Sequence, residues 1–160
     1  MPYERLLKSN RIKPHRANQN EIKQLLQLAT RDLNTAKRNL DEAPDWAYSI
    51  AYNSILQASR ALMFFDGYRP RGSEQHATVV EFVEERLGAR YAPQVRLFDQ
   101  MRWKRHRVIY EVAGLISKNE AKQAIAFAKE FVEKKCDWFT CVSAREMAGS
   151  RWRGASSTFR

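Results

Sequence analysis

A long stretch with almost no charge constrains the fold of this chain most. From Trp46 to Phe65 the only charged side chain is that of Arg60. The apolar residues of this stretch recur at helical spacing, which predicts a helix over residues 45–65, about 30 Å long. A helix with so little charge is covered by other parts of the protein on most of its sides. The stretch therefore predicts a helix buried within a helical protein.

A polar but mostly uncharged stripe runs along the same predicted helix. It consists of Ser49, Asn53, Gln57 and Arg60. Such a stripe suits a subunit interface or a ligand-binding cleft better than open water. We therefore expect this side of the helix to face a partner subunit or a ligand.

Two further segments on either side of this helix have helical periodicity. The first covers about residues 21–40, with Asn20 as its expected N-cap. The second covers about residues 74–87, with Ser73 as its expected cap. Both place their apolar residues at steps of three and four, which is typical of helices that pack by one face.

The second half of the chain contains two more predicted helices. One opens near Pro93 and ends or bends at Gly114. The other follows the capping box Ser117-Lys118-Asn119-Glu120 and continues to about Val142. No segment alternates with the period of a strand, and no hairpin turn stands out. We therefore expect an all-α fold, an antiparallel bundle of four to five helices.

The chain length fits one folded domain with basic ends. Its 160 residues suffice for one core. We expect residues 1–18 to form a basic N-terminal arm, residues 19–143 the bundle, and residues 144–160 a basic flexible tail. Cys136 and Cys141 have no metal-ligand spacing and are too few for a disulfide framework. They are expected to be small apolar fillers.

Nothing in the sequence indicates a membrane segment or a metal site. A run of about 18 apolar residues is missing, and the N-terminus lacks the apolar region of a signal peptide. His15, His76 and His106 are scattered and show no zinc pattern. We therefore expect a cytoplasmic protein that needs no cofactor.

The net charge favours a polyanionic partner. The formal charge is +10 at pH 7, which suits RNA, DNA, a nucleotide or an acidic protein. The alternative is that the charge only confers solubility. Against that alternative, the charge is uneven, because residues 96–107 contain a single acidic residue, Asp99, among many basic ones. The basic residues are Arg96, Arg102, Lys104, Arg105 and Arg107.

Arg105 is the most unusual residue of this basic segment. An apolar seam at helical spacing passes through Phe98, Met101, Arg105, Val108 and Val112. An arginine on such a seam costs stability unless it is paired or has a function. Arg105 is therefore the first candidate for a functional residue.

A mixed cationic face surrounds this arginine. Arg102, Arg105, His106 and Ile109 fall within about one third of the helix circumference. Guanidinium groups suit phosphate oxygens, and imidazole suits proton transfer near neutral pH. We expect this face to bind a phosphodiester and to assist attack by a ribose 2′-hydroxyl on the adjacent phosphorus. Lys104 either adds a phosphate contact or belongs to a solvated surface.

Other residues extend this candidate site. Tyr110 is expected to position phosphate or to donate a proton. Trp103 either stacks on a base or packs in the core. Arg69 and Arg71 lie in a basic loop and are expected to guide an anion toward the N-terminus of the next helix, with His76 near that mouth. The alternative for His76 is a surface position without a role.

Several segments occur together in the order and spacing of a known family. These segments are residues 47–63, Gly67-Tyr68-Arg69-Pro70, Glu74-Gln75-His76, and Arg105-His106 with Tyr110 and Glu111. Over residues 20–135 the chain resembles HEPN-domain proteins. Within this family, it resembles the short stand-alone members, which are related to the toxins associated with nucleotidyltransferases.

The resemblance implies a helical bundle that dimerises and brings two arginine motifs together across a cleft. Many members are metal-independent endoribonucleases, often toxins encoded beside a small nucleotidyltransferase, while others bind nucleotides or act as non-catalytic partners. The ribonuclease motif has an arginine, a polar residue, and a histidine after four to six intervening residues. Arg105 and His106 match its first two positions, and Tyr110 stands where four intervening residues would place the histidine.

Three functional hypotheses follow. The favoured one is a homodimeric module that binds RNA or nucleotide and pairs with a nucleotidyltransferase encoded nearby, with Tyr110 as an acceptor of a nucleotidyl group. The second is a metal-independent endoribonuclease toxin, in which Arg105 binds phosphate and His106 or Tyr110 replaces the usual histidine. The third is a helical adaptor with no role in nucleic-acid binding.

Overall fold

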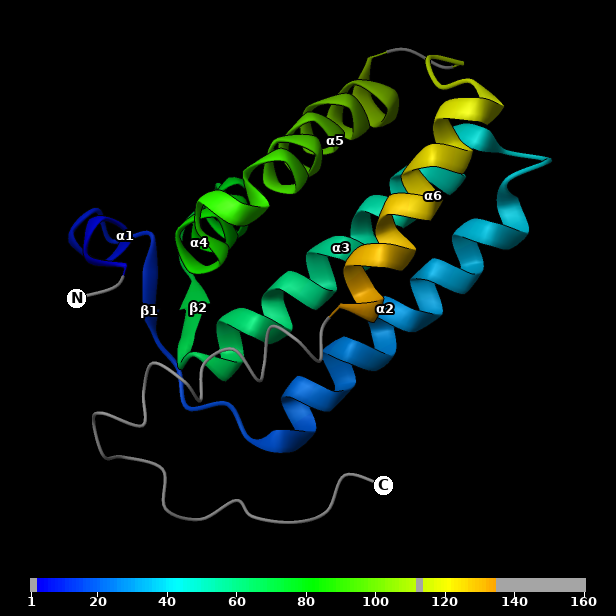
Figure 1. The fold of residues 1–160 in the computed structure, drawn as a ribbon. Helices are drawn as coiled ribbons and strands as arrows, with labels where there is room; N and C mark the ends of the chain where they lie inside the picture. Colours follow the sequence, from blue (N-terminus) through cyan, green and yellow to red (C-terminus); the bar gives the residue numbers. More distant parts are fainter. Residues whose placement is uncertain (1–2, 112–113, 135–160) are drawn as a thin grey trace.

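The computed structural model describes residues 3–111 and 114–134. The described residues form a bundle of packed helices (Figure 1), which confirms the predicted all-α fold. The last part of the predicted fifth helix, both cysteines and the predicted tail lie outside the described residues. The helices are α1 (Glu4–Lys8), α2 (Gln19–Asn39), α3 (Pro44–Phe65), α4 (Gln75–Leu87), α5 (Ala92–Tyr110) and α6 (Lys118–Glu133), with a 3₁₀ turn at Ala89–Tyr91 and the strands β1 (Ile12–Pro14) and β2 (Tyr68–Pro70).

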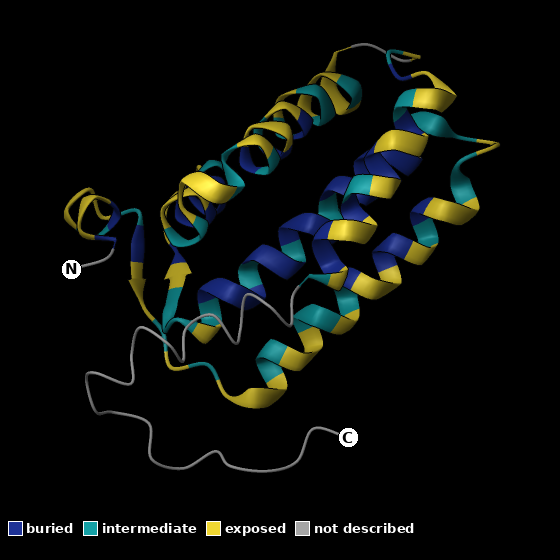
Figure 2. Ribbon diagram, viewed as in Figure 1, coloured by how far each residue is buried: buried dark blue, intermediate teal, exposed yellow. Residues whose placement is uncertain are grey.

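Helix α3 is the central element of the bundle. It packs against α2, α4, α5 and α6, and 13 of its 22 residues are buried. Figure 2 shows α3 as largely buried, whereas α2 and α5 have exposed outer sides. Helices α2 and α3 approach each other closely. The buried Ser54 hydroxyl of α3 donates a hydrogen bond to the Ala29 carbonyl of α2 at 2.7 Å. The charge-poor segment therefore occupies the covered position that its composition predicted.

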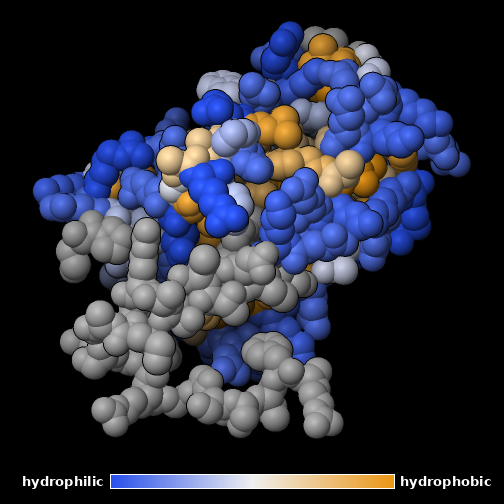
Figure 3. All heavy atoms as spheres, viewed as in Figure 1, coloured by the Kyte–Doolittle hydropathy of each residue, from blue (hydrophilic) through white to orange (hydrophobic). Residues whose placement is uncertain are grey.

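One face of the bundle is mostly polar. Figure 3 shows a face that is largely hydrophilic, with hydrophobic atoms in its middle. None of the helices within the described ranges is both long and apolar enough to cross a membrane.

Two short strands were not expected from the sequence. β1 and β2 pair antiparallel, with Ile12 opposite Pro70 and Pro14 opposite Tyr68. Each strand has three residues, too few to show an alternating pattern. The pairing joins the predicted basic arm to the predicted basic loop and brings α1 onto the bundle.

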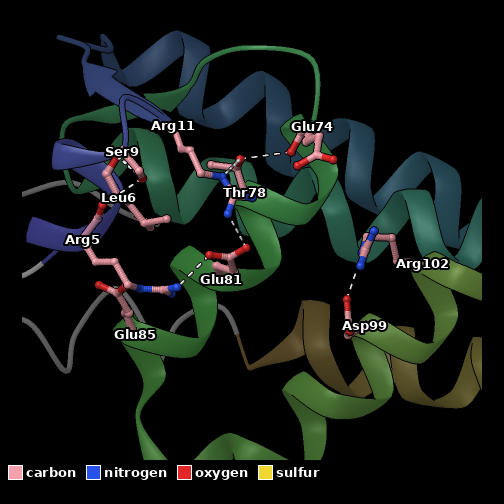
Figure 4. A network of polar contacts seen from close by, with 10 residues as sticks. All are labelled: Arg5, Leu6, Ser9, Arg11, Glu74, Thr78, Glu81, Glu85, Asp99 and Arg102. Atoms are coloured by element: carbon pink, nitrogen blue, oxygen red, sulfur yellow. Dashed lines mark hydrogen bonds and ion pairs between the residues drawn. The ribbon is translucent and has the colours of Figure 1, made fainter.

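Cations of this N-terminal segment are held by carboxylates of α4. Arg11 forms an ion pair with Glu81 and also donates from Nε to the Thr78 hydroxyl at 3.2 Å. Arg5 lies 3.2 Å from Glu81 and 3.3 Å from Glu85 (Figure 4). These two positive charges therefore stabilise the fold rather than an interface with a polyanion.

Helix starts differ from the expected caps in two places. The N-cap of α2 is Asn18 and not Asn20, because the Asn18 side chain accepts from the Glu21 amide while the Glu21 carboxylate accepts from the Asn18 amide. The expected cap Ser73 is also wrong, since α4 begins after Glu74 without a side-chain cap. The capping box at Ser117 is confirmed.

The cap of α2 provides a first prediction. Asn18→Ala removes the acceptor of the Glu21 amide and should lower the free energy of unfolding by about 1 kcal/mol. Asn20→Ala is the matched control within the first turn. It should lower the free energy of unfolding by less than about half of the loss caused by Asn18→Ala. Urea denaturation followed by circular dichroism measures both. Equal losses in the two variants would contradict the assignment of the cap.

Candidate functional site

Arg105 lies where α5 packs against α3. Its side chain is half-buried, and its guanidinium carbon is 5.4 Å from the centre of the buried Tyr52 ring. The Nε atom of Arg105 is buried and has no hydrogen-bond partner among the described residues. Within the same residues Arg105 also forms no ion pair. The arginine on the apolar seam is thus a partly desolvated cation that stacks on an aromatic ring and lacks a counter-charge.

Tyr52 is tied to a histidine of a third helix. Its hydroxyl oxygen lies 3.0 Å from Nδ1 of His76 at the start of α4, and the two rings are stacked. Burial raises the pKa of Tyr52 well above its ordinary value, so the hydroxyl keeps its proton at neutral pH. No other acceptor for this proton occurs among the described residues. One hydrogen bond therefore joins the hydroxyl to Nδ1, and the tautomer of the imidazole sets which of the two groups donates.

Three guanidinium groups surround this tyrosine–histidine pair. Burial lowers the pKa of His76, and the charges of Arg105, Arg60 and Arg102 lower it further. Arg60 of α3 donates to the Gln75 side chain at 3.0 Å. We call Arg60, Arg102 and Arg105, together with Tyr52 and His76, the arginine cluster.

Only one cation of the arginine cluster has a carboxylate partner. Arg102 donates from Nε to Asp99 at 2.9 Å (Figure 4). Its guanidinium carbon also lies over the Trp103 ring, 4.6 Å from the ring centre. Arg60 and Arg105 form no ion pair within the described residues. The cluster therefore holds an excess of positive charge next to His76, whose lowered pKa favours the neutral imidazole. Such an arrangement suits a phosphate group.

The pKa of His76 makes stability depend on pH. A histidine with a lowered pKa in the folded state binds fewer protons there than in the unfolded chain. The contribution of His76 is therefore present above about pH 6.5 and is lost as the pH falls through the lowered pKa. His76→Gln should flatten this acid-side loss in urea titrations between about pH 7.5 and 5. His106→Gln, which removes an exposed imidazole, is the control, and an equal flattening there would contradict the assignment.

A small pocket adjoins the cluster at Arg60. Its volume is about 170 Å³. Arg69 of β2 also lines it, and after burial the charge of Arg69 is the main cause that lowers the pKa of Arg60. Two cations thus face one small space. We call it the Arg60 pocket, and its lining residues are His15, Glu21, Arg60, Phe64, Arg69, Pro70 and Gln75.

Comparison with models of known protein families shows to which family the chain belongs. The profile of the HEPN domain matches residues 22–138, most of the chain. The chain belongs to the HEPN family. A search of the curated proteins found no match to it.

The residues of α5 that resemble the HEPN motif do not all join the arginine cluster. The rings of His106 and Tyr110 contact each other in a tilted arrangement, with an interplanar angle of 44° and ring centres 4.8 Å apart, and both residues are exposed. Arg102 and Arg105 turn toward α3 instead. The face predicted for α5 is therefore divided into a half-buried cationic part and an exposed aromatic part.

Two other predicted phosphate contacts of this HEPN domain have protein partners. Lys104 forms an ion pair with Glu120 of α6 and lines a separate pocket of about 240 Å³ with Tyr48 and Leu97. Arg71 donates to the Asn10 side chain at 2.8 Å. His76 and Arg69, by contrast, lie at the cluster and at the Arg60 pocket. The assignment of all these residues to phosphate binding stays a prediction.

Tyr52 is a site residue that no sequence pattern selected, whereas Arg60 was selected only as a member of a stripe. Arg60 belongs to the polar stripe of α3, which predicted a cleft or an interface. On the same stripe, the Gln57 side-chain oxygen is buried without a hydrogen-bond partner among the described residues. Tyr52 gave no comparable indication, because a tyrosine in a charge-poor helix looks like an ordinary core residue. Its role depends on which helices meet at it.

No metal centre is visible in the described part of the chain. Within residues 3–111 and 114–134, no three histidine, cysteine, aspartate or glutamate side chains come together to hold an ion.

Proposed function

We propose that this HEPN domain binds RNA or a nucleotide through the phosphate groups of its ligand, at the arginine cluster. The observation that carries the proposal is the half-buried guanidinium of Arg105, which lacks a counter-ion and stacks on Tyr52 beside His76. A partly buried cation without a partner costs stability in the free protein. A bound phosphate offsets that cost and accepts bonds from the arginine fork.

We also propose that the protein acts as a homodimer with a nucleotidyltransferase-type partner. The exposure of Tyr110 supports the pairing with a partner enzyme, since the residue is 71% exposed. Tyr110 is then the acceptor of the nucleotidyl group. Tyr110→Phe should abolish labelling by such a partner while RNA binding at the arginine cluster persists.

The test of ligand binding compares two arginines of α5. Arg105→Gln should weaken binding of a short RNA by about tenfold, because a charge-assisted bond is worth about 1.5–3 kcal/mol. Arg96→Gln removes an equal charge from an exposed position of the same helix and should change affinity by about twofold or less. Fluorescence anisotropy at low and high salt measures both variants.

The same samples distinguish the competing functions. RNA that is cut in EDTA, with 2′,3′-cyclic phosphate ends, would assign the domain to the metal-independent endoribonucleases instead. Absence of RNA and nucleotide binding at low salt would overturn the proposal and leave the adaptor hypothesis. Equal losses for Arg105→Gln and Arg96→Gln would show nonspecific attraction to the basic helix rather than a site.

A further inference from the structure

The pocket that Lys104 lines is a second cavity, separate from the arginine cluster. It lies where α3, α5 and α6 meet, and none of its lining residues belongs to the cluster. Its volume of about 240 Å³ is below the range of about 300–1,000 Å³ that is usual for drug-sized ligands. The cavity therefore suits a small molecule. We call it the Tyr48 pocket.

The Tyr48 pocket is named after a tyrosine that is almost completely buried. Tyr48 of α3 is only 6% exposed, and its hydroxyl forms no hydrogen bond within the described residues. Burial, and to a smaller extent the charge of Glu120, raise the pKa of Tyr48 to about 12, so the hydroxyl keeps its proton at neutral pH. Buried tyrosine hydroxyls usually have a hydrogen-bond partner. This hydroxyl is therefore a donor available to a ligand in the pocket.

Two opposite charges line the same pocket. Lys104 of α5 forms an ion pair with Glu120 of α6, and both side chains are partly exposed. The Glu120 carboxylate also accepts from the Ser117 amide at 3.0 Å in the capping box of α6, which orients it. Its bonds to Lys104 and Ser117 lower the pKa of Glu120, so it is ionised at neutral pH. The lining residues thus include one charge of each sign, in contrast to the arginine cluster with its excess of positive charge.

Part of the pocket wall is apolar. Leu97 and Met101 of α5 and Ala124 of α6 contribute to it. Leu97 is 41% exposed, so the wall presents apolar surface to water. An aliphatic group bound in the pocket removes this surface from water, which favours binding.

We propose that the Tyr48 pocket binds a small zwitterion with an aliphatic side chain, of the class of the aliphatic α-amino acids. The ligand ammonium lies against Glu120, and the ligand carboxylate accepts from Lys104 and the Tyr48 hydroxyl. The aliphatic group packs on Leu97 and Met101. This site is distinct from the proposed phosphate site and does not depend on it.

The ion pair itself selects for a zwitterion. A ligand that contacts Lys104 and Glu120 replaces the direct contact between them. A molecule with one charge satisfies one member of the pair and leaves the other without a partner, which costs free energy. A zwitterion supplies a partner for both. It also adds no net charge to a pocket whose own charges balance.

The test compares L-leucine with molecules that lack one of its features. Isothermal titration calorimetry of the full chain should show that L-leucine binds about tenfold or more tighter than 4-methylpentanoate, which lacks the ammonium, and 3-methylbutylamine, which lacks the carboxylate. L-Alanine, which lacks most of the aliphatic group, should also bind about tenfold more weakly. Since L-leucine has no net charge, its affinity should change by about twofold or less when the salt concentration rises from about 50 to about 300 mM.

Four variants assign the binding to the Tyr48 pocket. Tyr48→Phe removes only the hydroxyl and should weaken L-leucine binding by about fivefold or more. Glu120→Gln, which keeps the capping box because glutamine also serves there, should weaken it by about tenfold. Lys104→Met should do the same and should remove the preference for L-leucine over 3-methylbutylamine, because Glu120 then lacks its lysine partner. Lys122→Met, at an exposed position of α6, is the control and should change the affinity by about twofold or less.

The inference is overturned by any of three results. L-Leucine that shows no binding at about 10 mM, where even a millimolar site is nearly saturated, would exclude the site. Binding of 4-methylpentanoate or 3-methylbutylamine as tight as that of L-leucine would show that the pocket does not recognise a zwitterion. Equal losses for Lys104→Met and Lys122→Met would place the binding elsewhere. The proposed phosphate binding stands in all three cases, because none of the substituted residues belongs to the arginine cluster.

Discussion

Phe98→Ala should lower the free energy of unfolding by about 3–5 kcal/mol, the usual range for a buried phenylalanine. Phe98 is fully buried and joins three helices. Its ring centre on α5 lies 5.6 Å from that of Tyr52 on α3 and 5.9 Å from that of Phe131 on α6. Removing it leaves a cavity at their junction, which the long packed helices can close only in part.

The neighbouring residue provides the control for this prediction. Leu97→Ala removes a side chain that is 41% exposed and should cost about 1 kcal/mol or less. Urea denaturation of both variants, followed by circular dichroism, gives the difference. Similar losses for Phe98→Ala and Leu97→Ala would contradict the placement of Phe98 at the junction.

The candidate site depends on the same junction. Phe98 supports the ring of Tyr52, and Tyr52 in turn contacts Arg105 and His76. The arginine cluster therefore lies directly on the core and not on a loop. Its arginines are held by packed helices, which reduces the ordering that a ligand must cause on binding.

The central helix could be predicted from the sequence because its cause is local. A run with one charged residue cannot face water along its whole length, and the helix observed over Pro44–Phe65 agrees with the predicted 45–65. The position of Arg105 was predictable for the same reason. Its place on an apolar seam is visible in the spacing of α5 and corresponds to a half-buried side chain in the structure.

Contacts between distant segments could not be predicted in this way. The pairing of β1 with β2 joins residues more than fifty positions apart, and each strand is too short to show a period. The bond between Tyr52 and His76 depends on how α4 packs against α3. From the sequence, Tyr52 looks like an ordinary core residue, and His76 has a surface position as the alternative to a place at the site.

The distribution of charge shows the same limit. Arg5 and Arg11 contribute to the net charge, but carboxylates of α4 neutralise them. Lys104 likewise pairs with Glu120 of α6. A count of basic residues includes all three. Only the packed structure shows that these three have carboxylate partners and that Arg105 and Arg60 have none within the described residues. The cations that remain without a counter-charge are the ones that indicate a ligand.

Asp66→Ala should lower the free energy of unfolding by about 3 kcal/mol, because it removes a largely buried carboxylate that binds two partners. Asp66 follows α3 and accepts from the Tyr3 hydroxyl at 2.6 Å and from Nε of Arg86 at 2.7 Å. Its side chain is only 10% exposed. The Tyr3 ring is stacked on Phe82 at 4.2 Å, so the carboxylate fastens the N-terminal segment to both α3 and α4.

Two comparison variants show which interaction of Asp66 causes the loss of stability. Glu111→Ala breaks the pair with Arg107, in which both side chains are more than half exposed, and should cost less than about 1 kcal/mol. Tyr3→Phe removes only the hydroxyl bond to Asp66 and should cost about 1 kcal/mol. The order Asp66→Ala, Tyr3→Phe, Glu111→Ala in urea denaturation is thus expected. An Asp66→Ala loss no larger than that of Glu111→Ala would show that the N-terminal segment is held by its apolar contacts alone, since Tyr3 and Leu6 would then keep it in place without the carboxylate.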